Sequence, residues 1–120
     1  MREDQRKYRR FKTKDEIFAA FVIPTEPVIV GRILDVSRGG VGIQYLATRK
    51  LETGPTSIKI FALNSPNMER IESRVVYDFE IPEESWSTPM VRRCGIKFEG
   101  HRSEVQAKVK RIVQDAPAVL

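Results

Sequence analysis

Apolar and polar residues alternate along most of this chain, with the period of two that is typical of β-strands. The clearest example is segment 57–63, in which Ile58, Ile60 and Ala62 occupy every second position and share one face. The pattern predicts six strands, over residues 16–23, 28–35, 41–45, 57–63, 70–79 and 91–99. Residues typical of turns, chiefly proline, glycine and asparagine, separate these segments, so we expect antiparallel strands joined by loops.

The last of these segments alternates imperfectly. Its four apolar core candidates are Val91, Cys94, Ile96 and Phe98. Val91 and Cys94 are three positions apart, so they would face opposite sides of a regular strand. We therefore expect a bulge near Arg93 or Gly95, which would turn both side chains towards the core.

Beyond residue 102 the apolar spacing changes to that of a helix. Ser103 and Gln106 fit the pattern of a capping box at its start, and Pro117 is expected to end it. The apolar stripe of the predicted helix, 103–115, consists of Val105, Val109, Ile112 and Val113. Six strands followed by one amphipathic helix predict a mostly β fold, a small antiparallel β-barrel or curled sheet with the C-terminal α-helix packed over an opening.

Length and charge divide the chain into parts. Its 120 residues suit one domain with its own core. The formal net charge is +5, and residues 1–14 hold seven basic and two acidic side chains, whereas the rest holds fourteen of each. We therefore expect a flexible basic N-terminal arm (1–14), a folded domain (15–115) that ends in the helix, and a frayed tail (116–120).

Other features argue against several classes of protein. No apolar run approaches the roughly 20 residues that span a bilayer, and the charged start lacks a signal-peptide pattern, so we expect a cytoplasmic protein. The single cysteine, Cys94, suits a core position, and the single histidine, His101, suits a capping or solvated one. Because the common catalytic and metal-binding motifs are missing, we expect no enzyme, metal site or cofactor.

Two short motifs are the strongest functional signal. Arg6 and Arg10 form an RxxxR pattern within the basic arm, and residues 35–40 read DxSxxG, with Asp35, Ser37 and Gly40 at the fixed positions. Each motif alone is common: four arginines in a short arm readily give RxxxR, and Asp35 and Ser37 also suit an ordinary turn. Arg2 and Arg6 satisfy RxxxR as well.

The two motifs in this order, ahead of this pattern of strands and a final helix, resemble the PilZ domain family, and the resemblance covers nearly the whole chain. It implies a PilZ-like β-barrel that binds the bacterial second messenger cyclic di-GMP and acts as a receptor or adaptor. It also favours Arg6 and Arg10 over Arg2 and Arg6, because the second arginine of the family's motif usually runs directly into an apolar residue and a strand, as Arg10 runs into Phe11. The ligand-binding residues that the resemblance implies are Arg6, Arg9, Arg10, Asp35, Ser37, Arg38, Gly39 and Gly40.

The chemistry of guanine gives this resemblance a physical reason. An arginine fork matches the acceptors O6 and N7, and its plane can stack on the base. The opposite edge of guanine offers two N–H donors, which suit the carboxylate of Asp35 with Ser37 beside it. Gly39 and Gly40 would allow close approach to the backbone, make a reversal with positive φ, and offer N–H groups to a phosphate.

Two other functions stay open. A basic arm on a small barrel is also found in single-stranded nucleic-acid-binding proteins, but the neutral body and the absence of an evident row of exposed aromatic residues make nucleic acid a poorer expectation. The chain could also be a PilZ adaptor that binds only a partner protein. For the receptor, we expect the ligand to order the arm and so change a surface that an effector protein recognises.

Overall fold

The structure is a computed structural model that describes residues 11–12, 17–22, 28–47, 51–63, 65–82 and 90–115. In these ranges, the elements are β1 (Phe11–Lys12), β2 (Ile17–Phe21), β3 (Ile29–Val36), β4 (Gly40–Ala47), β5 (Gly54–Ala62), β6 (Met68–Glu80), β7 (Met90–Phe98) and α1 (Arg102–Asp115). The six predicted strands correspond to β2 through β7, and the predicted helix corresponds to α1. The additional strand, β1, lies within the segment expected to be the basic arm.

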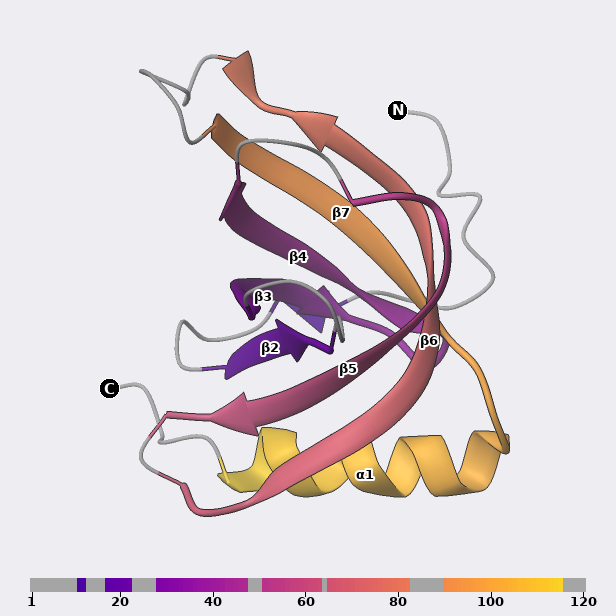
Figure 1. Ribbon diagram of the computed structural model, residues 1–120. Coiled ribbons are helices and arrows are strands. Elements are labelled where there is room, and N and C mark those ends of the chain that lie inside the picture. The colour runs from indigo at the N-terminus through magenta and orange to yellow at the C-terminus, as the bar shows by residue number, and fades with distance from the viewer. Residues whose placement is uncertain are drawn as a thin grey trace, which may run out of the picture.

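Six of the strands close into an antiparallel barrel, as the sequence predicted. The hydrogen-bonded order is β3-β2-β5-β6-β7-β4, and β4 pairs with β3 to complete the ring. Figure 1 shows the long, strongly curved strands β5, β6 and β7 that form much of the wall. β1 pairs with residues 35–36 of β3. It lies along the same edge of β3 as β2, which pairs with residues 29–32, so β3 has three neighbours.

Alternation of side chains builds the core. Ile58, Ile60 and Ala62 of β5 are buried, as expected from their spacing. The other buried apolar residues of the barrel are Ile17, Ala19, Phe21, Ile33, Val41, Ile43, Tyr45, Ile71, Val75, Cys94, Ile96 and Phe98. Most of them are β-branched or aromatic, the residue types that pack well on a pleated sheet.

The predicted bulge in β7 is wrong, and so is the core position of Val91. β7 alternates regularly, with Arg92 at the inward position and Val91 only half-buried. The bulge lies on the neighbouring strand β6, between Val75 and Tyr77. Arg92 is tolerated inside because the carboxylate of Asp78, also inside, neutralises it with a 2.6 Å ion pair.

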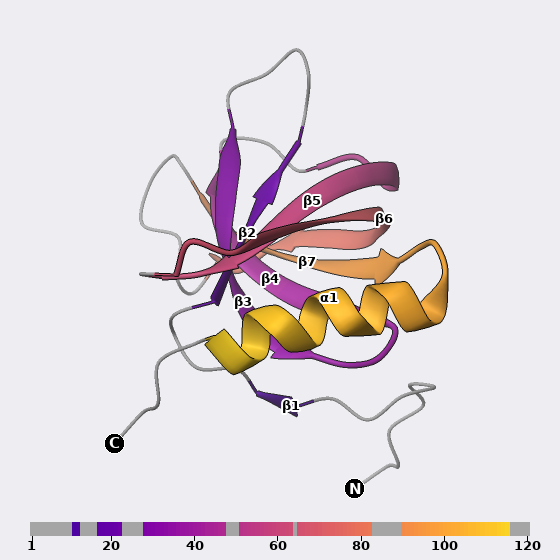
Figure 2. The same cartoon turned by 90° about the horizontal axis from the view of Figure 1, so that it is seen from below.

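α1 packs against β5 and β6, and Figure 2 shows it crossing one end of the barrel. Val105 and Ile112 are buried and Val109 packs against the core, but Val113 is 43% exposed, so the predicted stripe is one residue too wide. The helix also begins one residue earlier than the predicted cap at Ser103. His101 occupies the cap position instead: its carbonyl accepts a 3.0 Å bond from the N–H of Val105.

Candidate functional site

The DxSxxG motif forms the turn that joins β3 to β4. The N–H of Ser37 donates to the carbonyl of Gly40 over 2.9 Å, and the N–H of Gly39 donates to the hydroxyl of Ser37 over 3.3 Å. The same hydroxyl lies 3.4 Å from the carbonyl of Gly40, to which it donates. Ser37 is buried and holds the turn together, whereas Arg38 at its tip is exposed. The ordinary turn role considered for Ser37 is thus present in the structure.

Gly40 of this turn is needed for a reason other than the expected one. In the described part of the chain the glycines with positive φ are Gly54 and Gly100, so the expectation of positive φ at Gly39 and Gly40 is wrong. A Cβ atom at Gly40 would instead collide with the backbone carbonyl of Ile96. The turn therefore lies directly against β7, where the carbonyl of Gly39 accepts a 2.8 Å bond from the N–H of Phe98.

Asp35 is turned to the outside of the barrel by a bulge in β3. Ile33 pairs with Ile43 and Asp35 pairs with Gly42, so Leu34 is an extra residue in β3. A one-residue shift moves a side chain to the opposite face of a sheet, so Asp35 leaves the inward face that Ile33 occupies. Both oxygens of its carboxylate lie 3.1 Å from where a Cβ atom of Gly42 would be. The carboxylate thus lies across Gly42.

Asp35 is one end of a row of directly paired residues on the outer face, Asp35, Gly42, Gly95 and Tyr77, which we call the outer strip. The Tyr77 ring lies over Gly95, because a Cβ atom there would collide with it. The bulge in β6 sets this position, just as the bulge in β3 sets that of Asp35. Tyr77 also stacks on Phe79, with the ring centroids 5.7 Å apart.

Sequence reasoning missed three residues of the outer strip, Gly42, Gly95 and Tyr77. Glycine inside a strand often marks close approach by another group, so Gly42 and Gly95 carried a usable signal. Tyr77 carried none, because its face depends on the bulge. The sequence showed no evident row of exposed aromatic residues, but β6 presents two of them, Tyr77 and Phe79, which are 41% and 47% exposed.

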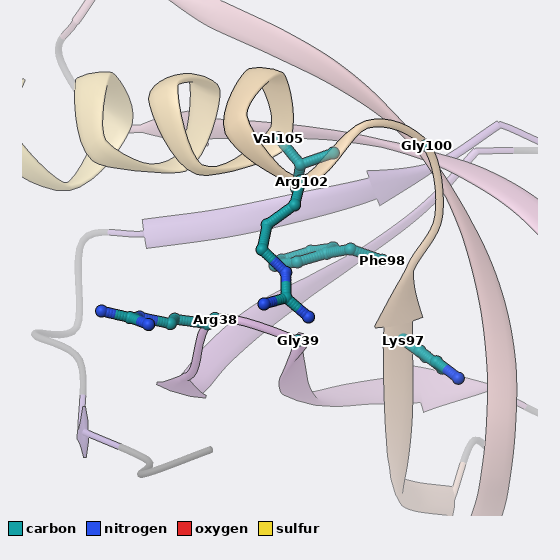
Figure 3. A pocket seen from close by; sticks show the side chains of 7 residues that line it. All are labelled: Arg38, Gly39, Lys97, Phe98, Gly100, Arg102 and Val105. Carbon is teal, nitrogen blue, oxygen red and sulfur yellow. The ribbon is translucent and has the colours of Figure 1, made fainter. Parts of the chain in front are cut away.

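Two cavities lie where the turn meets α1, and Arg38 lines both. The first, about 280 Å³, is lined by Arg38, Gly39, Lys97, Phe98, Gly100, Arg102 and Val105 (Figure 3). The second, about 380 Å³ and mostly apolar, is lined by Val36, Ser37, Arg38, Gln106, Val109, Lys110 and Val113. Both cavities are therefore shared between the turn and α1.

The predicted arginines Arg6, Arg9 and Arg10 lie outside the described residues. β1, which follows them in the sequence, is described, and its two residues pair with the motif: Phe11 with Val36 and Lys12 with Asp35. The chain that leaves the RxxxR segment is thus hydrogen-bonded to the strand that carries Asp35. This pairing places β1 beside the start of the DxSxxG motif, although the two are more than 20 residues apart in the sequence.

A buried polar network lies inside the barrel, towards the end opposite the motif turn. The carboxylate of Asp78 accepts hydrogen bonds from Arg92 and from the hydroxyl of Tyr45. Burial, together with the bond to Asp78, raises the pKa of Tyr45 above its usual range. Burial also raises the pKa of the Cys94 thiol to about 12, so this cysteine stays protonated at neutral pH. These features indicate a structural role.

Within the described ranges, no group of three or more His, Cys, Asp or Glu side chains could hold a metal ion. The helix in this part of the chain is too short and too polar to cross a membrane.

No family model and no curated protein sequence matches the chain. Solved structures do match. The PilZ domain of YcgR from Escherichia coli with c-di-GMP is 16% identical, with a TM-score of 0.69 over 92% of this chain and 90% of that one. The MrkH–c-di-GMP complex of K. pneumonia is 14% identical, with a TM-score of 0.63 over 94% of this chain and 52% of that one.

A third similar structure is the PilZ domain of CeSA from a cellulose-synthesizing bacterium, which is 17% identical, with a TM-score of 0.56 over 88% of this chain and 95% of that one. Two of these matches span nearly the full length of a single PilZ domain, whereas the chain spans about half of MrkH. The closed barrel, its strand order and its final helix are therefore those of the PilZ fold, and the described part of this chain is a domain of that fold.

Proposed function

We propose that this protein is a PilZ-type receptor for cyclic di-GMP, which it binds at the DxSxxG turn with the help of the RxxxR segment. The observation that carries the proposal is the pairing of β1 with β3. Arg10 directly precedes Phe11 in the sequence, and Phe11 pairs with Val36, the neighbour of Asp35, so the RxxxR segment is joined directly to a strand that pairs with the DxSxxG motif. The structural neighbours from YcgR and MrkH contain c-di-GMP, which supports the same ligand class.

The outer strip supports recognition of a guanine base. The carboxylate of Asp35 is presented outwards and can accept the N1–H and N2–H donors of guanine. Gly42 and Gly95 have no side chains of their own and are covered by the Asp35 carboxylate and the Tyr77 ring. The exposed Tyr77 ring at the other end of the strip offers a π face for stacking. A hydrogen-bond acceptor and a stacking surface thus occur together on one face.

The arm supplies the remaining contacts in this proposal. Arg6, Arg9 and Arg10 would bind the acceptor edges of guanine and the phosphates, since a guanidinium fork suits both. Each charge-assisted hydrogen bond contributes about 1.5–3 kcal/mol, whereas ordering one backbone residue costs about 1–2 kcal/mol. Several contacts together can leave about −8 kcal/mol, which corresponds to micromolar affinity. Binding would therefore order the arm and change a surface offered to an effector protein.

The backbone of the turn contributes less to phosphate binding than the sequence suggested. The N–H of Gly39 is already bonded to the hydroxyl of Ser37, so it would have to leave that bond to meet a phosphate. Arg38, at the exposed tip, has no such constraint of backbone geometry and is the better phosphate ligand within the motif.

Isothermal titration calorimetry with cyclic di-GMP tests the proposal, with cyclic di-AMP as the matched control ligand. We expect micromolar binding of cyclic di-GMP only, and a loss of at least tenfold in Asp35→Ala, because the guanine donors lose their acceptor. Circular dichroism of the variant should show an intact fold. A folded wild-type protein that binds neither ligand would contradict the proposal and favour an adaptor that binds protein alone.

A second candidate function is single-stranded nucleic-acid binding, which the stacked, exposed pair Tyr77 and Phe79 favours. Both functions would use the outer face, but they differ in salt dependence and in their need for Asp35. Oligonucleotide affinity would fall steeply between low and physiological salt and would be insensitive to Asp35→Ala. Cyclic di-GMP binding should require the carboxylate at every salt concentration.

A further inference from the structure

We propose that Arg102, the first residue of α1, binds a phosphate of the ligand and so connects the helix to the nucleotide site. The inference rests on the proposed function and extends it to a residue outside both sequence motifs. It also gives the site a physical link to α1, the element that packs across β5 and β6.

The first argument is the charge of the cavity at the start of α1. Of the residues that line this cavity of about 280 Å³, Arg38, Lys97 and Arg102 are cationic and none is acidic. Glu99, which precedes Gly100, forms an ion pair with Arg74 over 3.6 Å and is not part of the lining. A concave site lined by one sign of charge concentrates counter-ions of the other sign. The cavity is therefore suited to an anion.

The second argument is the position of the Arg102 side chain. Figure 3 shows it running from the helix across the Phe98 ring and ending near Gly39, while Arg38 and Lys97 extend to either side. The three cations are thus spread along the surface rather than gathered at one point. Such a row suits an extended ligand with two phosphodiesters, and the planar guanidinium of Arg102 at its centre can donate two bonds to one of them.

The third argument is that the helix dipole does not favour an arginine at this position. The amino end of a helix carries partial positive charge, so a cation in the first turn is unfavourable and an anion is favourable. Glu104 is the first-turn residue that fits this rule. A phosphate bound to Arg102 would offset this unfavourable interaction, because its negative charge would also interact with the positive end of the helix dipole.

The fourth argument is continuity with the outer strip. On β4 and β7, the pair Gly40 and Lys97 is the next outward pair after Gly42 and Gly95. Two residues along a strand correspond to roughly 7 Å, a step that one ribose can bridge. A base over the strip would thus place its phosphate towards Lys97 and the cavity. The outer strip would thus hold the base of one nucleotide, and the cavity would hold its phosphate.

The test compares Arg102→Gln with Arg111→Gln, which removes the same charge from the same helix. Arg111 is the matched control because its Nε bonds Glu69 on β6 over 3.0 Å, away from the cavity. We expect Arg102→Gln to lower cyclic di-GMP affinity about tenfold by calorimetry, and to shift the phosphorus resonance of the bound ligand. Circular dichroism of the ligand-free variant should show an intact fold. Arg111→Gln should bind like wild type.

Two results would overturn the inference. One is unchanged affinity in Arg102→Gln, and the other is an equal loss in both variants, which would show a general charge effect. Failure of the proposed function is distinct, because the wild-type protein itself would then show no affinity for cyclic di-GMP.

Discussion

Asp35 and Gly42 form a pair in which each residue sets the role of the other. The carboxylate lies across Gly42 because glycine has no Cβ atom, and it faces outwards because Leu34 is an extra residue in β3. The motif pattern predicted Asp35 and Ser37 as site residues. It could not predict the outward face of Asp35, because no turn residue marks the bulge at Leu34.

Replacing Gly42 by valine tests this pairing. The first added carbon would lie 3.1 Å from both oxygens of Asp35, and the branched side chain would displace the carboxylate. We expect cyclic di-GMP affinity to fall at least tenfold with the fold retained, measured by calorimetry and circular dichroism. Gly54→Ala is the control, since its positive φ of 129° strains any side chain but no atom lies within 4 Å. Unimpaired binding by Gly42→Val would contradict this account of Asp35.

At the scale of elements, β6 and β7 show how one bulge redistributes residues between the core and the surface. Before the bulge Val75 faces inwards, and after it Asp78 does so, while Tyr77 faces outwards. Sequence periodicity predicted both strands but assigned the bulge to β7, because it placed Val91 in the core. The ion pair between Arg92 and Asp78 instead allows Arg92 to take the inward position, and it joins residues from two strands that periodicity treats separately.

This ion pair predicts a large stability effect. Its side chains are only 9% (Arg92) and 1% (Asp78) exposed, so Asp78→Ala would leave Arg92 buried without its partner. We expect a loss of about 3–5 kcal/mol in the free energy of unfolding, measured by urea denaturation. Arg74→Ala breaks the exposed pair with Glu99 and should cost under about 1 kcal/mol. If both variants lost equally little, Arg92 would not depend on Asp78.

At the scale of the whole molecule, the account combines a neutral barrel with a basic N-terminal segment. Strand order along the chain and the final helix could be predicted, because alternation, turn residues and the helical apolar stripe are local signals. The pairing of β1 with β3 could not be predicted, because β1 is only two residues long and depends on its partner strand. That short strand nevertheless joins the residues that directly follow Arg10 in the sequence to the strand that carries Asp35.

Hydrogen–deuterium exchange with and without cyclic di-GMP tests the central claim most directly, since it reports on both motifs in one experiment. We predict that saturating ligand protects peptides covering residues 1–14 together with those covering Asp35–Gly42, whereas cyclic di-AMP protects neither. Peptides of β2 and β5, away from the outer strip, should be unchanged. Unchanged exchange in both motif segments at saturating cyclic di-GMP would contradict the account.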